Sequence, residues 1–358
     1  MHIRTTVVVA AAAAALSGVS LPPQAAGVIT DGTSNPHWDE RPTGTNEQYR
    51  GLDAVSKRVV WVAGEEGGVL RTTDKGQTWR DVAPPGTSKL AFRDVEATSR
   101  RHASVLSIGT GTDSRIYTTE DAGKTWTLAF VNRAPNAFYD CMAFWGEGKH
   151  GLAVSDPVNG KFRIIRTRDF GTSWRVLSDR GMPRAKDGEF AFAASGTCLV
   201  AEGSSRAWLG SGGGASRVFR TRDRGLTWKV SPSRIPAAAA GGVFSLAFRN
   251  ARTGMAVGGD FTRPRKEDDT ASRTRNHGSG WQRVADVHGY RSGVDFVAKR
   301  HGTWVAVGPT GSDITRNAGN SWLRFSRTPY DAVSCTDQGV CWASGPEGAV
   351  ARLRFGRH

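Results

Sequence analysis

Thr72-Thr73-Asp74-Lys75-Gly76-Gln77-Thr78-Trp79 is the stretch on which the chain is built, because variants of it return five times. Three close copies occupy residues 119–126, 167–174 and 221–228, and two more divergent copies occupy 274–281 and 315–322. The closing tryptophans are 41 to 54 residues apart: Trp79, Trp126, Trp174, Trp228, Trp281 and Trp322. A period of this length is typical of repeated supersecondary units that stack or surround an axis.

The octet predicts a tight turn between two strands. Its third residue, Asp or Asn, accepts hydrogen bonds from backbone N–H groups two or three residues on, and its fifth, Gly, permits a positive φ. The Thr or Ser hydroxyls tie the ends of the turn together, and the Trp opens the next strand and packs between units. We therefore assign a structural role, without chemistry, to the third-place residues Asp74, Asp121, Asp169, Asp223, Asn276 and Asn317.

The pattern Ser/Thr-x-Asp-x-Gly-x-Thr/Ser-Trp resembles the Asp-box (BNR) repeat of sialidases, sortilin-type receptors, xyloglucan hydrolases and the photosystem II stability/assembly factor group. Phe138-Tyr139-Asp140 and residues 151–157 and 305–311 look typical of bacterial secreted relatives of the last group, which are often labelled oxidoreductases. The resemblance implies a β-propeller. It implies no particular function, because propellers host many unrelated activities.

The intervals between the octets divide into units of up to four short strands. They predict an all-β, seven-bladed propeller as one domain over residues 27–358. In the fourth unit we expect the inner strand at 189–194 and the second at 198–202, with a glycine spacer at 210–214. The last unit, 330–355, has only three strands, so we expect Trp38 and residues 30–41 to supply the fourth and close the ring.

Residues 1–26 have the pattern of a Sec-type signal peptide. Arg4 precedes an apolar core at 7–16 that is too short to span a bilayer, and cleavage after Ser20 or Ala26 fits equally well. No later stretch is apolar for 18 residues. We expect an exported, monomeric protein, periplasmic or secreted, without a transmembrane segment.

Charge bears on the choice of partner. The net charge is +15, and many arginines lie in or beside the octets, which predicts a basic outer rim. No cationic run is interleaved with stacking aromatics, and this disfavours nucleic acid. The expected partner is a protein or an envelope glycan or other polymer.

Four cysteines in an exported chain predict two disulfides. Cys335 and Cys341 fall on adjacent strands, and we expect them to be linked. The pairing of Cys141 with Cys198, in neighbouring units, is left open. No zinc-ligand spacing, CxxC motif or dinucleotide fingerprint occurs, so we expect no metal and no cofactor.

The turns opposite the octets predict a binding face around the mouth of the central channel. They carry carboxylates, tyrosines and arginines on what would be a rigid scaffold, where binding residues concentrate. Each carboxylate alone also fits an ordinary turn. The candidate residues are Arg50, Arg93, Asp94, Tyr139, Asp140, Asp156, Glu202, Asp260, Tyr290, Arg291, Asp313, Tyr330 and Asp331.

We favour a non-enzymatic binding or assembly scaffold, and we also consider a sialidase-like glycoside hydrolase. Sialidases combine three arginines, a tyrosine nucleophile and two carboxylates. Arg50, Arg93 and Arg291 with Tyr139 or Tyr330 and Asp140 or Asp156 provide the residue types. The Phe/Tyr-Arg-Ile-Pro segment that precedes the first repeat of sialidases is missing there; Ser233-Arg234-Ile235-Pro236 follows the fourth octet instead.

Overall fold

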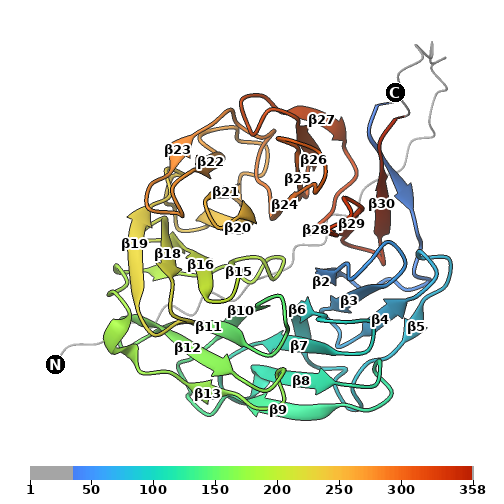
Figure 1. Cartoon of the computed structure of the whole chain (residues 1–358), viewed down its shortest axis with the longest axis vertical. Helices are drawn as coiled ribbons and strands as arrows, with labels where there is room; N and C mark the ends of the chain where they lie inside the picture. The colour runs from blue at the N-terminus through green and yellow to red at the C-terminus, as the bar shows by residue number, and fades with distance from the viewer. Residues whose placement is uncertain (1–34, 357–358) are drawn as a thin grey trace.

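The computed structural model describes residues 35–356 as seven antiparallel sheets around a central axis, a seven-bladed β-propeller (Figure 1). Strands A to D of a blade run from the axis outward. Blade one comprises β2 (Tyr49–Asp53), β3 (Val60–Gly64), β4 (Val69–Thr72) and β5 (Arg80–Asp81). Blade two comprises β6 (Ala91–Glu96), β7 (Ala103–Ile108), β8 (Arg115–Thr119) and β9 (Thr127–Val131). Blade three comprises β10 (Tyr139–Phe144), β11 (Gly151–Val158), β12 (Lys161–Thr167) and β13 (Arg175–Val176).

Blades four to six continue the ring. Blade four comprises β15 (Leu199–Glu202), β16 (Arg206–Gly210), β18 (Arg217–Thr221) and β19 (Trp228–Pro232). Blade five comprises β20 (Gly241–Asn250), β21 (Thr253–Asp260), β22 (Ala271–Thr274) and β23 (Gln282–Arg283), and its sheet is extended inward by β17 (Gly212–Gly213) and β14 (Glu189–Phe190). Blade six comprises β24 (Gly293–Phe296), β25 (Trp304–Gly308), β26 (Gly311–Thr315) and β27 (Leu323–Ser326). The helical turns in the described chain are η1 (Gly111–Asp113) and η2 (Asp179–Gly181), and no helix there could cross a membrane.

The seventh blade confirms the predicted ring closure. It combines β28 (Ala332–Cys335), β29 (Cys341–Ser344) and β30 (Val350–Arg354) with β1 (His37–Glu40), and Trp38 lies opposite Leu353. Figure 1 shows β1 in blue alongside β30 in dark red. The Trp38 ring packs against Tyr330, with centroids 5.3 Å apart, and its Nε1 donates to Ser312 Oγ at 2.9 Å. The expected signal peptide, 1–26, and the first residues of the predicted closing segment lie outside the described residues.

The octets form the expected turns. Asp74 Oδ1 accepts from the N–H groups of Gln77 and Thr78 at 3.0 Å, and its Oδ2 accepts from the Thr78 hydroxyl at 2.6 Å. The fourth and fifth residues of each octet both have positive φ. In all six octets the fourth N–H donates to a carbonyl of the A–B turn of the same blade, as Lys75 does to Arg58. The octets and the A–B turns therefore share one side of the disc, which we call the octet face. The opposite side is the channel-mouth face.

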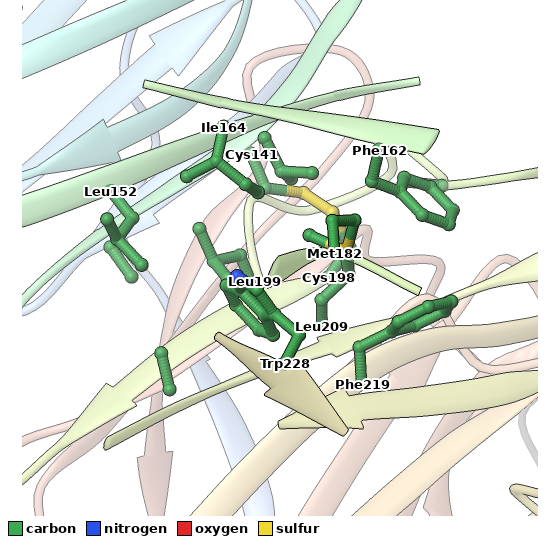
Figure 2. Close-up of a cluster of buried hydrophobic side chains, with 14 of the residues drawn as sticks. Cys141, Leu152, Phe162, Ile164, Met182, Cys198, Leu199, Leu209, Phe219 and Trp228 are labelled. Atoms are coloured by element: carbon green, nitrogen blue, oxygen red, sulfur yellow. A yellow bond between two sulfur atoms is a disulfide. The ribbon is translucent and has the colours of Figure 1, made fainter. Parts of the chain in front are cut away.

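The hydrophobic core lies between adjacent blades. A second set of tryptophans, on strand B, is almost fully buried: Trp61, Trp208, Trp304 and Trp342. Both disulfides are formed. Cys335–Cys341 joins β28 to β29 as predicted, and Cys141–Cys198 joins blades three and four. Figure 2 shows the second bridge beside Ile164, Met182 and Leu199 in the core between these two blades.

Blade four differs from the sequence-based assignment. Residues 198–202, predicted as its second strand, contain the innermost strand, β15, and the second strand is β16, which the prediction omitted. The predicted inner strand, 189–194, leaves the blade: its start forms β14 beside β17, and the rest belongs to the segment described below. Glu202 therefore ends at an A–B turn on the octet face, and the prediction that it lies at the channel mouth was wrong.

Candidate binding site at the closed channel mouth

Residues 191–197, which we call the plug, lie across the central channel. Asp156 Oδ1 in blade three accepts from Ala191 N at 2.8 Å, and the Ser195 hydroxyl donates to the Ser292 carbonyl, next to blade six, at 2.7 Å. The Thr197 carbonyl accepts from Leu246 N in blade five at 2.9 Å. Since blades one and two also hold the plug, it contacts five blades besides its own and must lie near the axis.

Two arginines from blades one and two hold the plug by its main chain. Arg93 Nη1 donates to the Ala193 carbonyl at 3.0 Å, and Arg50 Nη1 approaches the Ala194 carbonyl at 3.5 Å. Gly196 makes the close approach possible: its φ is +77°, and an added Cβ would lie 2.4 Å from Asp94 Oδ1. A glycine is therefore required where the plug passes blade two.

The same arginines form a charged cluster with two carboxylates. Arg50 pairs with Glu65 and, at 3.0 Å, with Asp331, while Arg93 Nη2 lies 3.1 Å from Glu65. Burial alone would lower the pKa of Arg50, but Asp331 and Glu65 outweigh it and raise that pKa. Burial, together with the charge of Arg50, lowers the pKa of Arg93 to about 10. Both cations stay charged at neutral pH and remain about one-fifth exposed, at 22% and 21%.

An aromatic cluster adjoins these charges. Phe192 of the plug stacks on Phe244 with ring centroids 3.7 Å apart, and Tyr290 meets Phe244 edge-on at 4.6 Å. Phe261 covers both phenylalanines and is 50% exposed. Burial raises the pKa of Tyr290, which keeps this ring neutral. The channel mouth thus presents charged and aromatic groups side by side.

Of the predicted residues, Arg50, Arg93, Tyr290 and Asp331 come together here. Arg291 and Asp313 form a neighbouring pair that is fully buried, with Arg291 Nε 2.7 Å from Asp313 Oδ2. Asp313 also accepts from His288, and Thr310 from Arg291. This pair is enclosed within the protein, so the prediction that it faces a ligand was wrong.

The remaining predicted residues do not contribute to the cluster. Tyr139 and Tyr330 are buried between strands, and Asp140 lies buried beside Asp156, whose Oδ1 holds the plug. Asp260 is engaged in its own loop with Thr262 and Arg263. Asp94 faces the next blade and accepts from Met142 N at 2.6 Å.

The sialidase-like set is not assembled. Arg291 is enclosed with Asp313 and cannot bind one ligand jointly with Arg50 and Arg93. The Tyr139 ring is fully buried and packs edge-on against Phe130 at 5.2 Å. Within residues 35–356 no group of three or more His, Cys, Asp or Glu side chains could hold a metal ion. The exposed groups offer recognition of main-chain carbonyls, carboxylates and apolar side chains.

Several residues of the site were missed by the sequence analysis. Glu65, which pairs with Arg50, and Gln48, which donates to Asp331 at 2.8 Å, were not among the predicted residues. The predicted inner strand, 189–194, overlaps the plug, and its Phe190 and Phe192 alternate with alanines as residues of a strand would. One available signal for the true second strand of blade four was Trp208. In four blades strand B is marked by a run that begins with Trp and ends with Gly, with small or apolar residues between. These runs start at Trp61, Trp208, Trp304 and Trp342.

No protein-family model and no curated protein matches the chain. Among solved structures, the chain is similar to YCF48 bound to a D1 peptide, with a TM-score of 0.63, 12% identity, and coverage of 92% of this chain and 97% of that chain. It is also similar to YCF48 from Cyanidioschyzon merolae, with a TM-score of 0.61, 16% identity and coverage of 89% and 98%. These similarities confirm the fold implied by the resemblance to the photosystem II stability/assembly factor group.

Proposed function

We propose that this chain is an exported, non-enzymatic propeller scaffold that binds a protein partner at its channel-mouth face. The observation that carries the proposal is the juxtaposition of Arg50, Arg93, Glu65 and Asp331 with the half-exposed Phe261. Arginine and aromatic residues are enriched at the centres of protein interfaces. A solved propeller of similar fold, YCF48, binds a peptide, which supports a peptide-like ligand. The signal-like pattern of residues 1–26 supports export.

The plug indicates what kind of contact this face makes. Arg93 already donates to a main-chain carbonyl there, and Phe244 already stacks on an inserted phenylalanine. A partner segment would meet the same chemistry beside the plug, with Phe261 packing on an apolar side chain and the partly exposed guanidinium edges meeting a carboxylate or a carbonyl. Charge-assisted hydrogen bonds of this kind give both orientation and affinity.

The proposal is tested by selecting peptides from a displayed library on the immobilised protein and measuring the affinity of each selected peptide for variants. Phe261→Ala should weaken binding at least several-fold. Leu323→Ala is the matched control, because Leu323 is similarly exposed, at 47%, on an outer strand of blade six. Selected peptides that bind both variants equally would place the interface elsewhere.

The enzymatic alternative is tested on the same preparation. The purified protein is incubated with sialosides and a panel of other glycosides, and we expect no turnover. If a glycoside is turned over, and the Tyr139→Phe variant loses this activity while its melting temperature is unchanged, the protein is a glycoside hydrolase and the scaffold proposal is wrong.

A further inference from the structure

On the octet face, blades three and four carry many cations without a carboxylate partner in the described chain. Five arginines of the channel-mouth face pair with carboxylates, namely Arg50, Arg93, Arg217, Arg263 and Arg291, although others there, such as Arg115 and Arg163, form no ion pair within residues 35–356. On the octet face, blades three and four carry a set of cations none of which forms an ion pair among the described residues. This set, which we call the basic tip surface, is Lys149, Arg166, Arg168, Arg175, Arg220, Arg222, Arg224 and Lys229.

Like charges even lie directly opposite one another on this surface. The C–D ladders pair Arg166 with Arg175 in blade three and Arg220 with Lys229 in blade four. Directly opposed like charges destabilise an antiparallel pair. The neighbouring carboxylates Asp169 and Asp223 keep their charge while they accept hydrogen bonds from their own octets, but they form no ion pair with these cations. With the exposed Glu147 they are outnumbered by the eight cations and offset them only in part. The arrangement leaves an excess of positive charge on this surface, and a bound anion would relieve the repulsion between these cations.

The cations of the two blades form one continuous surface. Arg166 Nη1 reaches the Arg224 carbonyl of the next blade at 3.5 Å. Burial, and then the charges of Arg224, Lys149, Arg168 and Arg166, lower the pKa of His150, which lies among them. Arg168 and Arg222 occupy the second place of adjacent octets, and both are exposed.

Exposed apolar side chains stand among these cations. The described chain has six large hydrophobic residues that are strongly exposed, and three of them are here: Phe170 at 42%, Val176 at 46% and Leu226 at 50%. Phe170 has a φ of 62° at the tip of its octet, where the other octets have Lys75, Ala122, Arg224, His277 and Ala318. A left-handed backbone is unfavourable for a bulky residue. Two adjacent turns thus project an apolar residue from a field of cations.

We propose that the basic tip surface docks on the surface of an anionic lipid membrane. Lysine and arginine side chains attract anionic headgroups, and apolar tips enter the boundary between headgroups and acyl chains. Phe170, Val176 and Leu226 come from three separate elements, two turns and β13. They therefore project at three separate points, which suits contact with the flat surface of a membrane. A soluble polyanion would use the cations and leave these apolar tips in water. The channel-mouth face would point away from the membrane and stay accessible.

The test is co-sedimentation of the full chain with vesicles. Binding is expected to vesicles of equal parts phosphatidylglycerol and phosphatidylcholine and not to phosphatidylcholine alone. The Arg168→Gln/Arg222→Gln/Lys229→Gln variant should bind the anionic vesicles on the order of a hundredfold more weakly, since each cation near the surface contributes to the attraction. The Phe170→Ala/Leu226→Ala variant should bind several-fold more weakly. Arg263→Gln and Phe261→Ala, on the opposite face, are matched controls and should bind like the wild type.

Other outcomes overturn the proposal. Equal binding to neutral vesicles, or no vesicle binding, excludes an anionic membrane. The protein is also tested for binding to soluble inorganic polyphosphate and to polyglutamate. If the Arg168→Gln/Arg222→Gln/Lys229→Gln variant loses this binding and the Phe170→Ala/Leu226→Ala variant keeps it, the surface binds a soluble polyanion or an acidic protein instead. The substituted side chains are exposed, and the arginine variant removes like-charge repulsion, so its melting temperature should not fall; this measurement separates lost binding from lost folding. Since Phe261→Ala affects only the channel mouth, each proposal can fail without the other.

Discussion

Arg93 of blade two donates a hydrogen bond to the carbonyl of Ala193, 3.0 Å away and 100 residues later in the chain. The contact holds the plug across the channel and at the same time places the Arg93 guanidinium beside Glu65. The binding site and the closure of the channel therefore depend on the same side chain.

Arg93→Gln should loosen the plug. A hydrogen bond from a charged donor contributes about 1.5 to 3 kcal/mol, and the shorter amide cannot reach both Ala193 and Glu65. Hydrogen exchange followed by mass spectrometry should show faster exchange in residues 191–197, with no change in blade six. Arg175→Gln, an exposed arginine on the other face, is the control. Unchanged exchange in the plug of Arg93→Gln would mean that the other contacts suffice to hold it.

Trp38→Ala should destabilise the whole ring. The indole packs on Tyr330 and Phe325 and hydrogen-bonds Ser312, and its strand supplies the outer edge of blade seven. The Trp38 side chain is only half-buried, so we expect a loss of about 3 kcal/mol, the lower end for Trp→Ala changes. Chemical unfolding measures this loss. Deleting residues 27–45 should lower the melting temperature further and promote self-association through the freed edge. A truncated protein that melts like the wild type would contradict the closure.

Stability should fall as the pH rises from about 4 to about 8. Burial raises the folded-state pKa of Asp94 to about 8, and burial likewise raises those of Asp156 and Asp295 to about 7. Between the unfolded-state and folded-state pKa of each carboxyl group, the folded protein therefore binds more protons than the unfolded chain. The contribution of these groups to the free energy of unfolding is greatest below the unfolded-state pKa and is lost as the pH rises through the folded-state pKa. Asp94→Asn keeps an oxygen for Met142 N and removes the charge, so it should raise the melting temperature at pH 9, flatten the profile and have little effect at pH 4. Glu120→Gln, on the exposed part of an octet, is the control. A profile that rises with pH would contradict these shifts.

The two disulfides should differ in their contribution. Cys141 and Cys198 are 57 residues apart, whereas Cys335 and Cys341 are 6 apart. By the loop-entropy relation the longer bridge contributes about 4 kcal/mol and the shorter one about 2.4 kcal/mol. The Cys141→Ser/Cys198→Ser variant should therefore unfold at a lower denaturant concentration than Cys335→Ser/Cys341→Ser. The reverse order would show that native-state packing, and not chain entropy, dominates.

Local signals predicted the repeating parts of the fold. Asp74 and its counterparts bind groups within a few residues, so the turn geometry follows from the octet itself. The same holds for Cys335 and Cys341, which face each other across a hairpin. Blade four departs because residues 190–193, with alternating Phe and Ala, satisfy the pattern of a strand, but the plug is held by Arg50, Arg93 and Asp156 from other blades.

The number of blades, the octet turns, the closing strand at Trp38 and one disulfide could be predicted from the amino-acid sequence, because each depends on contacts within a repeat or on counting strands. Which cations are paired depends on the folded ring and could not be predicted in this way. Arg50 pairs with Asp331, 281 residues later in the chain, and Arg291 pairs with Asp313 on β26 of blade six, whereas Arg166 and Arg220 face other cations across their ladders. Charge interactions act through space over a few ångströms, and residues hundreds of positions apart reach that distance only when the ring is closed.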